Sequence, residues 1–230
     1  MKSKTFLMQS TPQVVGWRTA RLAVWASTVC LAVGAGVIGD WLVALAVTAC
    51  LFLALLPKGF SVVSGIVFPS GLTTGILVYA LAAILLGEVA GFYIKITWWD
   101  VGLHLYASTV LSIVGFALVM MVTGGAPPVV APWVLAVLAF AFSMMVGAMW
   151  ELMEFTLDAV FGTVTQRSGL PDTMGDMAVN LVGATGGAIA GLAHVTRGAR
   201  WPLAGLLGRF MDENPAHYPA RRASRPPFRR

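Results

Sequence analysis

Six apolar stretches follow one another along this chain with only short joins between them. A bilayer with a hydrocarbon core of about 30 Å requires about 20 apolar residues in helical form. Inside that core each backbone polar group must be satisfied within the span itself, which favours helices. We therefore predict an all-α membrane protein, a bundle of about six transmembrane helices. The predicted spans are residues 20–38, 41–56, 72–89, 100–122, 132–160 and 172–195.

The composition agrees with this class of protein. Of the 230 residues, 58% are apolar and 11% are charged, whereas a soluble domain carries about 25% charged residues. We expect a single transmembrane domain over residues 1–195, followed by a basic tail over residues 196–230 that is rich in Arg and Pro and is predicted to be disordered. Residues 60–69 are apolar but too few to cross, so they are predicted to form a re-entrant or interfacial segment between spans two and three.

The basic residues indicate the topology. Six spans place both termini on one side of the membrane. The N-terminal segment, Lys58 and the tail then share that side with thirteen Lys and Arg residues, while only Lys95 and Arg167 fall on the other. Because basic residues accumulate on the cytoplasmic side, both termini are predicted to be cytoplasmic. The net charge of +5 is thus a topology signal; the bilayer is the expected partner, and no nucleic acid is expected.

Most acidic residues gather at the opposite, non-cytoplasmic ends of the spans. Two of the ten lie in the tail, at Asp212 and Glu213. The other eight are Asp40, Glu88, Asp100, Glu151, Glu154, Asp158, Asp172 and Asp176. A charged side chain within an apolar span costs at least about 2.5 kcal/mol on insertion scales, so such residues are expected to have a function or a partner.

Helical spacing concentrates these acids into three polar stripes at one membrane depth. Residues three, four or seven positions apart share a helix face. The three stripes are Asp100, His104 and Ser108; Glu151, Glu154 and Asp158; and Asp172, Asp176 and Asn180. If the stripes face inward, they line one cavity that opens away from the cytoplasm. Glu88 and Gln166 are expected to support this cluster from nearby polar positions.

A purely structural interpretation explains part of this pattern. Asp100 and Asp172 lie near predicted helix N-termini, where a negative charge is favourable. The same argument fails for Glu151 and Glu154, which lie toward the C-terminus of their helix. Polar packing and a functional site therefore both remain open. A separate set of small residues predicts close helix packing on the last span: Gly183, Gly187 and Gly191.

The polar segments resemble a known family. The segments WWDVGLH (98–104), WELMEFTLDAVFG (150–162), Gln166 and GLPDTMGDMAVNLVGA (169–184) resemble the bacterial YjdF-like inner-membrane proteins over residues 71–191. More distantly, the pattern D-x3-H, then Glu with a nearby Gln, then D-x3-N-x2-G is similar to the VanZ-like membrane proteins. The resemblance implies a multi-pass protein of the bacterial inner membrane whose polar motifs act together, and it implies no reaction.

Three kinds of function fit these observations. The first, favoured by the small size, the glycine face and the basic tail, is an accessory or scaffold subunit of a membrane assembly, in which the acids form polar staples. The second is a divalent-metal-binding protein, or an enzyme acting on a lipid phosphate. Its candidate ligands are Asp100, His104, Glu151, Glu154, Asp158, Asp172 and Asp176. The third is a proton- or cation-coupled transporter. Whether the protein is an enzyme is left open by its sequence.

Overall fold

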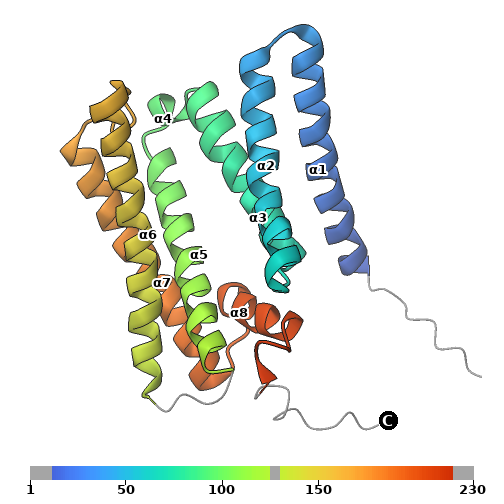
Figure 1. Ribbon diagram of the computed structural model, residues 1–230, viewed down its shortest axis with the longest axis vertical. Helices are drawn as coiled ribbons and strands as arrows, with labels where there is room; N and C mark the ends of the chain where they lie inside the picture. The colour runs from blue at the N-terminus through green and yellow to red at the C-terminus, as the bar shows by residue number, and fades with distance from the viewer. Residues whose placement is uncertain (1–11, 125–129, 220–230) are drawn as a thin grey trace, which may run out of the picture. The chain divides into compact units, whose positions relative to one another are not determined.

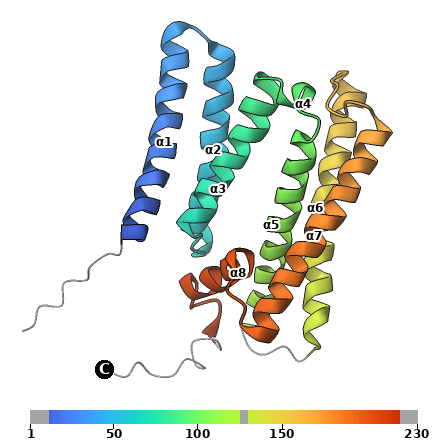
Figure 2. The same ribbon diagram turned by 180° about the vertical axis from the view of Figure 1, so that it is seen from behind.

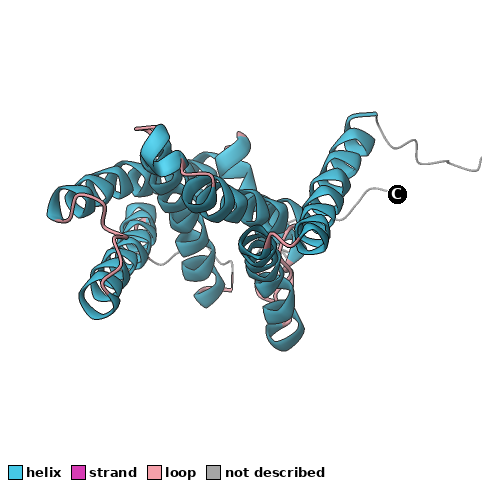
Figure 3. Cartoon of the chain, turned by 90° about the horizontal axis from the view of Figure 1, so that it is seen from above, coloured by secondary structure: helices cyan, strands magenta, loops and turns pink. Residues whose placement is uncertain are grey.

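The computed structural model describes residues 12–124 and 130–219, and in these ranges the chain folds only into helices (Figure 1, Figure 3). Six of the helical segments are long and apolar enough to cross a membrane, which confirms the predicted fold class. The helices are α1 (Pro12–Ile38), α2 (Trp41–Ser64), α3 (Ser70–Ala80), the π-helix η1 (Leu81–Val89), α4 (Phe92–Lys95), α5 (Trp99–Val122), α6 (Pro132–Phe161), α7 (Leu170–Arg197) and α8 (Pro202–Glu213).

The chain divides into two compact units, and the first comprises residues up to 57 together with residues 70–91. Its core lies where Cys50 and Ala54 of α2 pack against Leu77 and Ala80 of α3. The turn between α1 and α2 requires Gly39, which has φ of 82°, a value that suits glycine because it lacks a Cβ. The first unit thus contains α1, α2 up to Pro57, α3 and η1, and a short turn joins α1 to α2.

The second predicted span ends later than expected. Pro57 was predicted to stop it at residue 56, but α2 continues through Pro57 to Ser64. A proline removes one backbone donor and bends a helix, yet membrane helices tolerate this loss because neighbouring groups compensate. The predicted interfacial segment 60–69 is therefore partly helix, and only residues 65–69 are irregular, beginning at Gly65 with φ of 71°.

The second unit comprises residues 58–69 and the chain from Phe92 onward. In it, α5, α6 and α7 pack against one another, and α8 packs against α5 and α7; Figure 2 shows α5, α6 and α7 side by side from behind. Added Cβ atoms at Gly183, Gly187 and Gly191 would collide with α5, so these glycines lie at the α5–α7 contact. The Ser143 hydroxyl of α6 donates to the Ser108 carbonyl of α5 at 2.7 Å.

The beginning of the basic tail is ordered, contrary to the prediction of disorder from residue 196 onward. Residues 202–213 form α8, whose buried residues Ala204, Leu207 and Met211 repeat at helical spacing. Beyond it, Tyr218 is 1% exposed and its hydroxyl donates to the Ala117 carbonyl at 2.7 Å. The density of Arg and Pro concealed this short amphipathic helix. The predicted disorder over residues 220–230 lies outside the described residues.

Candidate functional site

One end of the three-helix bundle in the second unit collects the acidic side chains. The chain runs into α5 at Trp99, returns along α6 to Phe161 and enters α7 at Leu170. The start of α5, the end of α6 and the start of α7 therefore lie together, at the end of this bundle away from α8 (Figure 1). Each of the three polar stripes predicted from the sequence begins or ends at this place.

A triad of side chains forms the centre of this end of the bundle. His104 Nε2 lies 3.7 Å from Asp100 Oδ1 and 3.8 Å from Asp176 Oδ2. One potential ligand atom from each of the three lies within 4.8 Å of the other two. These separations are longer than hydrogen bonds. Ligand atoms around a tetrahedral metal with bonds of about 2.1 Å lie about 3.4 Å apart, so the triad has nearly the spacing of a metal's ligands.

The orientation of the His104 ring suits metal binding. Its Nδ1 lies 3.3 Å from Asn180 Oδ1. Because an amide oxygen only accepts, the tautomer with its proton on Nδ1 would donate to Asn180 and turn the Nε2 lone pair toward the two carboxylates. Histidines that bind metals are commonly held in this way by a neighbouring acceptor. Asn180 has room because Gly147 faces it, where an added Cβ would lie 2.8 Å from the Asn180 amide nitrogen.

Glu151 is the most deeply buried acid of the group. The residue is 4% exposed, and neither carboxylate oxygen has a hydrogen-bond partner among the described residues. The Thr173 side chain faces it without hydrogen-bond geometry, and the charges of His104 and Asp100 act on it. An unpartnered buried carboxylate is costly. Glu151 therefore marks a position that a cation or a proton would complete.

Asp158 has a structural role instead. Its carboxylate accepts hydrogen bonds from the Thr163 and Thr165 hydroxyls at 2.7 and 2.6 Å. It also accepts the backbone N–H groups of Thr165 and Gln166 at 2.7 and 2.9 Å. Three of these four hydrogen bonds go to Oδ1 and one to Oδ2, so both carboxylate oxygens have donors. Asp158 thus closes the loop that follows α6.

Two further acids have partners of their own. Glu154 accepts a hydrogen bond from the Trp150 indole at 3.0 Å, and its carboxylate is also near the charge of Glu151. Asp172 accepts the backbone N–H of Arg167 at 3.0 Å. Both acids lie at the edge of the triad, and each is already engaged by a neighbour. They resemble the polar staples that a structural interpretation predicts.

The predicted supporting residues lie in different places. The Ser108 hydroxyl donates to the His104 carbonyl of its own helix at 2.7 Å. The Gln166 side chain donates to the Thr173 hydroxyl at 2.5 Å and so ties the α6–α7 loop to α7. Glu88 belongs to the first unit, where its side chain is exposed. Asn180, described above, is the supporting residue that contacts the triad.

Sequence reasoning missed Thr173 at this end of the bundle. Thr173 faces Glu151, although it follows Asp172 directly and belongs to no predicted stripe. The Arg167 guanidinium lies 3.8 Å from the centroid of the Tyr93 ring, a cation–π contact. Thr173 has no signal in the sequence. The Trp150 contact to Glu154 does have one, since the two residues are four apart on a helix.

The fold and the site together define an integral membrane protein with six spans and a polar cluster at one end of a three-helix bundle. A family model described as "Predicted membrane protein (DUF2238)" matches residues 17–197, and the chain belongs to this family. This is the YjdF-like family that the polar motifs resemble, and its match extends into the N-terminal spans. The resemblance to VanZ-like proteins finds no support in these matches.

Among individual proteins, one relative from Thermotoga maritima, described as an uncharacterized protein, is 33% identical over 98 residues. The match covers 43% of this chain and 50% of the relative, so the chain spans about half the length of that protein. No solved structure matches the chain. The comparisons therefore support the family and the membrane assignment.

Proposed function

We propose that this membrane protein binds a divalent transition-metal cation such as Mn²⁺, Fe²⁺ or Zn²⁺ through Asp100, His104 and Asp176, with Glu151 beside them. The observation that supports it most is the spacing of 3.7 and 3.8 Å between His104 Nε2 and the two carboxylates. A mixed set of imidazole and carboxylate ligands suits these metals. A cation would also relieve the repulsion among the clustered carboxylates.

The scaffold function that the sequence favours explains fewer of these contacts. In that function every acid would be a polar staple held by neighbouring hydrogen-bond donors. Glu154, Asp158 and Asp172 fit this description, because each accepts a hydrogen bond from a neighbouring tryptophan or loop group. Glu151 has no hydrogen-bond partner among the described residues, and burying a charge without compensation is costly. The unpartnered Glu151 is what favours metal binding over a scaffold.

A proton- or cation-coupled transporter is less well supported. Transport pathways need polar groups distributed through the membrane. In the described parts of α5, α6 and α7, every acidic side chain lies at the triad end of the bundle. The remaining length of these helices faces its neighbours with small and apolar residues such as Ala139, Phe116 and Gly191. A binding site near one membrane surface fits this distribution better than a pathway.

We also propose that the protein lies in a bacterial inner membrane with both termini in the cytoplasm. The support is the distribution of basic residues, thirteen on the side of the termini and two on the other. The triad then lies toward the non-cytoplasmic face. A fluorescent-protein fusion at residue 230 would fluoresce if the C-terminus is cytoplasmic, and a periplasmic phosphatase fusion there would be active if it is not.

A matched pair of substitutions tests metal binding. Asp176→Asn removes one carboxylate of the triad, and Asp158→Asn makes the same change at a carboxylate that closes a loop. Purified full-length proteins would be titrated with Mn²⁺ and Zn²⁺, and bound metal would be measured by elemental analysis after removal of free ions. We expect about one ion per chain in the wild type and in Asp158→Asn, and binding at least about tenfold weaker in Asp176→Asn.

Two results would contradict the proposal. One is a wild-type protein that retains no metal at saturating Mn²⁺ or Zn²⁺. The other is equal metal content in Asp176→Asn and wild type, which would place the bound ions elsewhere. A His104→Ala variant provides an independent check, because it removes the nitrogen ligand without changing the number of carboxylates.

A further inference from the structure

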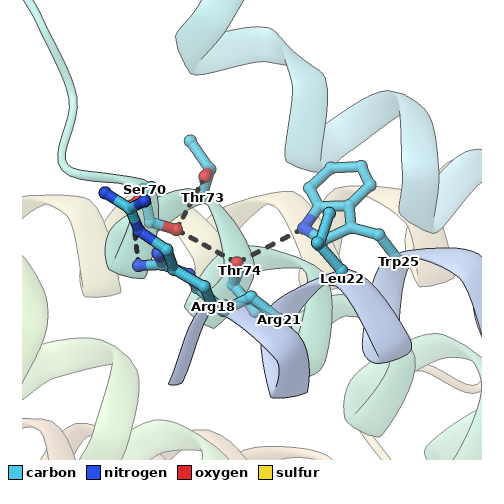
Figure 4. A pocket seen from close by; sticks show the side chains of 7 residues that line it. All are labelled: Arg18, Arg21, Leu22, Trp25, Ser70, Thr73 and Thr74. Carbon is cyan, nitrogen blue, oxygen red and sulfur yellow. Dashed lines mark hydrogen bonds between the residues drawn. The ribbon is translucent and has the colours of Figure 1, made fainter. Parts of the chain in front are cut away.

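A cavity of about 350 Å³ lies in the first unit between the start of α1 and the start of α3. Figure 4 shows its lining, which consists of Arg18, Arg21, Leu22, Trp25, Ser70, Thr73 and Thr74. Two of these seven side chains are cationic and none is acidic. The volume falls within the range of about 300–1,000 Å³ that is typical of small-molecule sites.

Hydrogen bonds organise the polar wall of this cavity. Arg21 Nη1 donates to Ser70 Oγ at 2.7 Å, and the Trp25 indole donates to Thr74 Oγ1 at 3.3 Å. The Thr73 and Thr74 hydroxyls both donate to the Ser70 carbonyl, at 3.1 and 3.0 Å. These contacts fix the Arg21 guanidinium at the first turn of α3, where the backbone N–H groups favour negative charge as well.

The cavity lies near the start of two candidate membrane spans. The spans in question are Arg18–Ile38 and Ser70–Val89; Arg18 lies in the second turn of α1, which begins at Pro12, and Ser70 is the first residue of α3. Leu22 and Trp25 follow Arg18 at helical spacing and extend its face deeper into the membrane. Leu22 is 70% exposed, which gives the cavity an apolar side. Arginine near the membrane surface and tryptophan below it are typical of the headgroup region.

We propose that this cavity binds the phosphate group of an anionic phospholipid, with the acyl chains along Leu22 and Trp25. Guanidinium groups bind phosphate oxygens through paired hydrogen bonds, and two of them line this one cavity. Inorganic phosphate has the same oxygen chemistry. The apolar wall at Leu22 and the position at the start of two spans favour the lipid over the free ion. This site is separate from the triad and independent of metal binding.

The test compares the binding of two phospholipids and of inorganic phosphate to the purified full-length protein in mild detergent. Native mass spectrometry would measure bound phosphatidylglycerol and phosphatidylcholine in the wild type, Arg18→Gln, Arg21→Gln and the double variant. Each arginine near an anionic lipid surface contributes about a fivefold change in affinity. We expect phosphatidylglycerol to bind better than phosphatidylcholine, and the double variant to bind it about 25-fold more weakly than wild type.

The control is Arg197→Gln, which removes an exposed arginine at the end of the last span and should leave lipid binding unchanged. Arg18→Gln keeps the Arg21–Ser70 hydrogen bond, so it tests the cavity even if the double variant does not fold. Unchanged phosphatidylglycerol binding in both arginine variants would overturn the proposal, and so would an equal loss in Arg197→Gln. If inorganic phosphate alone raised the melting temperature as much as phosphatidylglycerol, the lipid assignment would be wrong.

Discussion

Two adjacent glycines on α7 offer a sharp test of how this bundle is held together. Gly187 is buried against α5, and an added Cβ there would lie 2.6 Å from Ser112 Cβ and also collide with the Thr109 carbonyl. Gly186 is exposed, and an added Cβ there meets nothing within 4 Å. Replacing each glycine with alanine therefore makes the same chemical change in a blocked and in an open position.

The expected difference can be estimated from these contacts. Carbon atoms pack at about 3.5–4.0 Å, so alanine at position 187 requires α5 and α7 to move apart by about 1 Å locally. Overpacking of this kind costs about 1–3 kcal/mol. Both substitutions gain the same helix propensity, at most about 1 kcal/mol, and this gain cancels when the two variants are compared. Gly187→Ala should therefore be about 1–3 kcal/mol less stable than Gly186→Ala.

Thermal unfolding in detergent, followed by tryptophan fluorescence, measures this difference. For a chain of this size 1 kcal/mol corresponds to about 2–4 °C, so Gly187→Ala should melt about 2–12 °C below Gly186→Ala. Gly186→Ala should melt at or slightly above the wild-type temperature. Equal melting temperatures for the two variants would refute the inference that the glycines at the α5–α7 contact set the distance between these helices.

Three further predictions concern hydrogen bonds outside the triad. Tyr218→Phe removes the bond to the Ala117 carbonyl and should cost about 1 kcal/mol in thermal unfolding. Burial raises the pKa of Tyr218 to about 12, above its value of about 10 in the unfolded chain. The contribution of Tyr218 to folding stability is therefore complete below pH 10 and is lost as the pH rises from 10 to 12. Tyr218→Phe should make the fall in stability over this pH range less steep. Asn214→Ala removes bonds of 2.6 and 2.7 Å to Val67 and should speed proteolysis of the 65–69 loop. Asp158→Ala should lower the melting temperature by several degrees and leave the proposed metal binding unchanged.

The sequence predicts the spans well because the bilayer imposes a length and an apolar composition on each of them. The predicted start of α5 at residue 100 and the predicted end of α6 at residue 160 each differ by one residue from the structure. Helical spacing also predicts the polar stripes, because residues four apart on a helix share a face whatever the helix packs against. Asp100 and His104 were placed together on this basis.

The sequence predicts poorly whatever depends on a distant partner. The residues after Gly65 are held by Asn214, which accepts the Val67 N–H at 2.6 Å and donates to its carbonyl at 2.7 Å. Phe68 lies 5.9 Å from Phe210, and Phe210 lies 6.3 Å from Tyr218, measured between ring centroids. The contacts of Val67 and Phe68 join α8 or its flank to residues 65–69, and the Phe210–Tyr218 contact packs the chain after α8 against that helix. No local pattern in an Arg- and Pro-rich stretch indicates such contacts.

Contacts with other residues also separate Glu154 and Asp158, which have hydrogen-bond partners, from Glu151, which has none of standard geometry. Glu154 and Asp158 share a helix face with Glu151, and their spacing gives no reason to separate them. Their different roles follow from what approaches each position. A loop folds back onto Asp158 and a tryptophan reaches Glu154, whereas Glu151 faces the Thr173 side chain without a hydrogen bond of standard geometry.

One face of α7 connects the triad with the packing of the bundle. Asp176, Asn180, Gly183 and Gly187 follow one another at intervals of three or four residues, so they form a continuous stripe toward α5. In this stripe Asp176 and Asn180 contact His104, and the glycines let the backbones of α5 and α7 approach each other. The distance between the carboxylate of Asp176 and the imidazole is therefore set by the glycines below it. Substitutions at these α7 glycines should therefore change stability and the proposed metal affinity together, whereas substitutions at Asp158 should change stability alone.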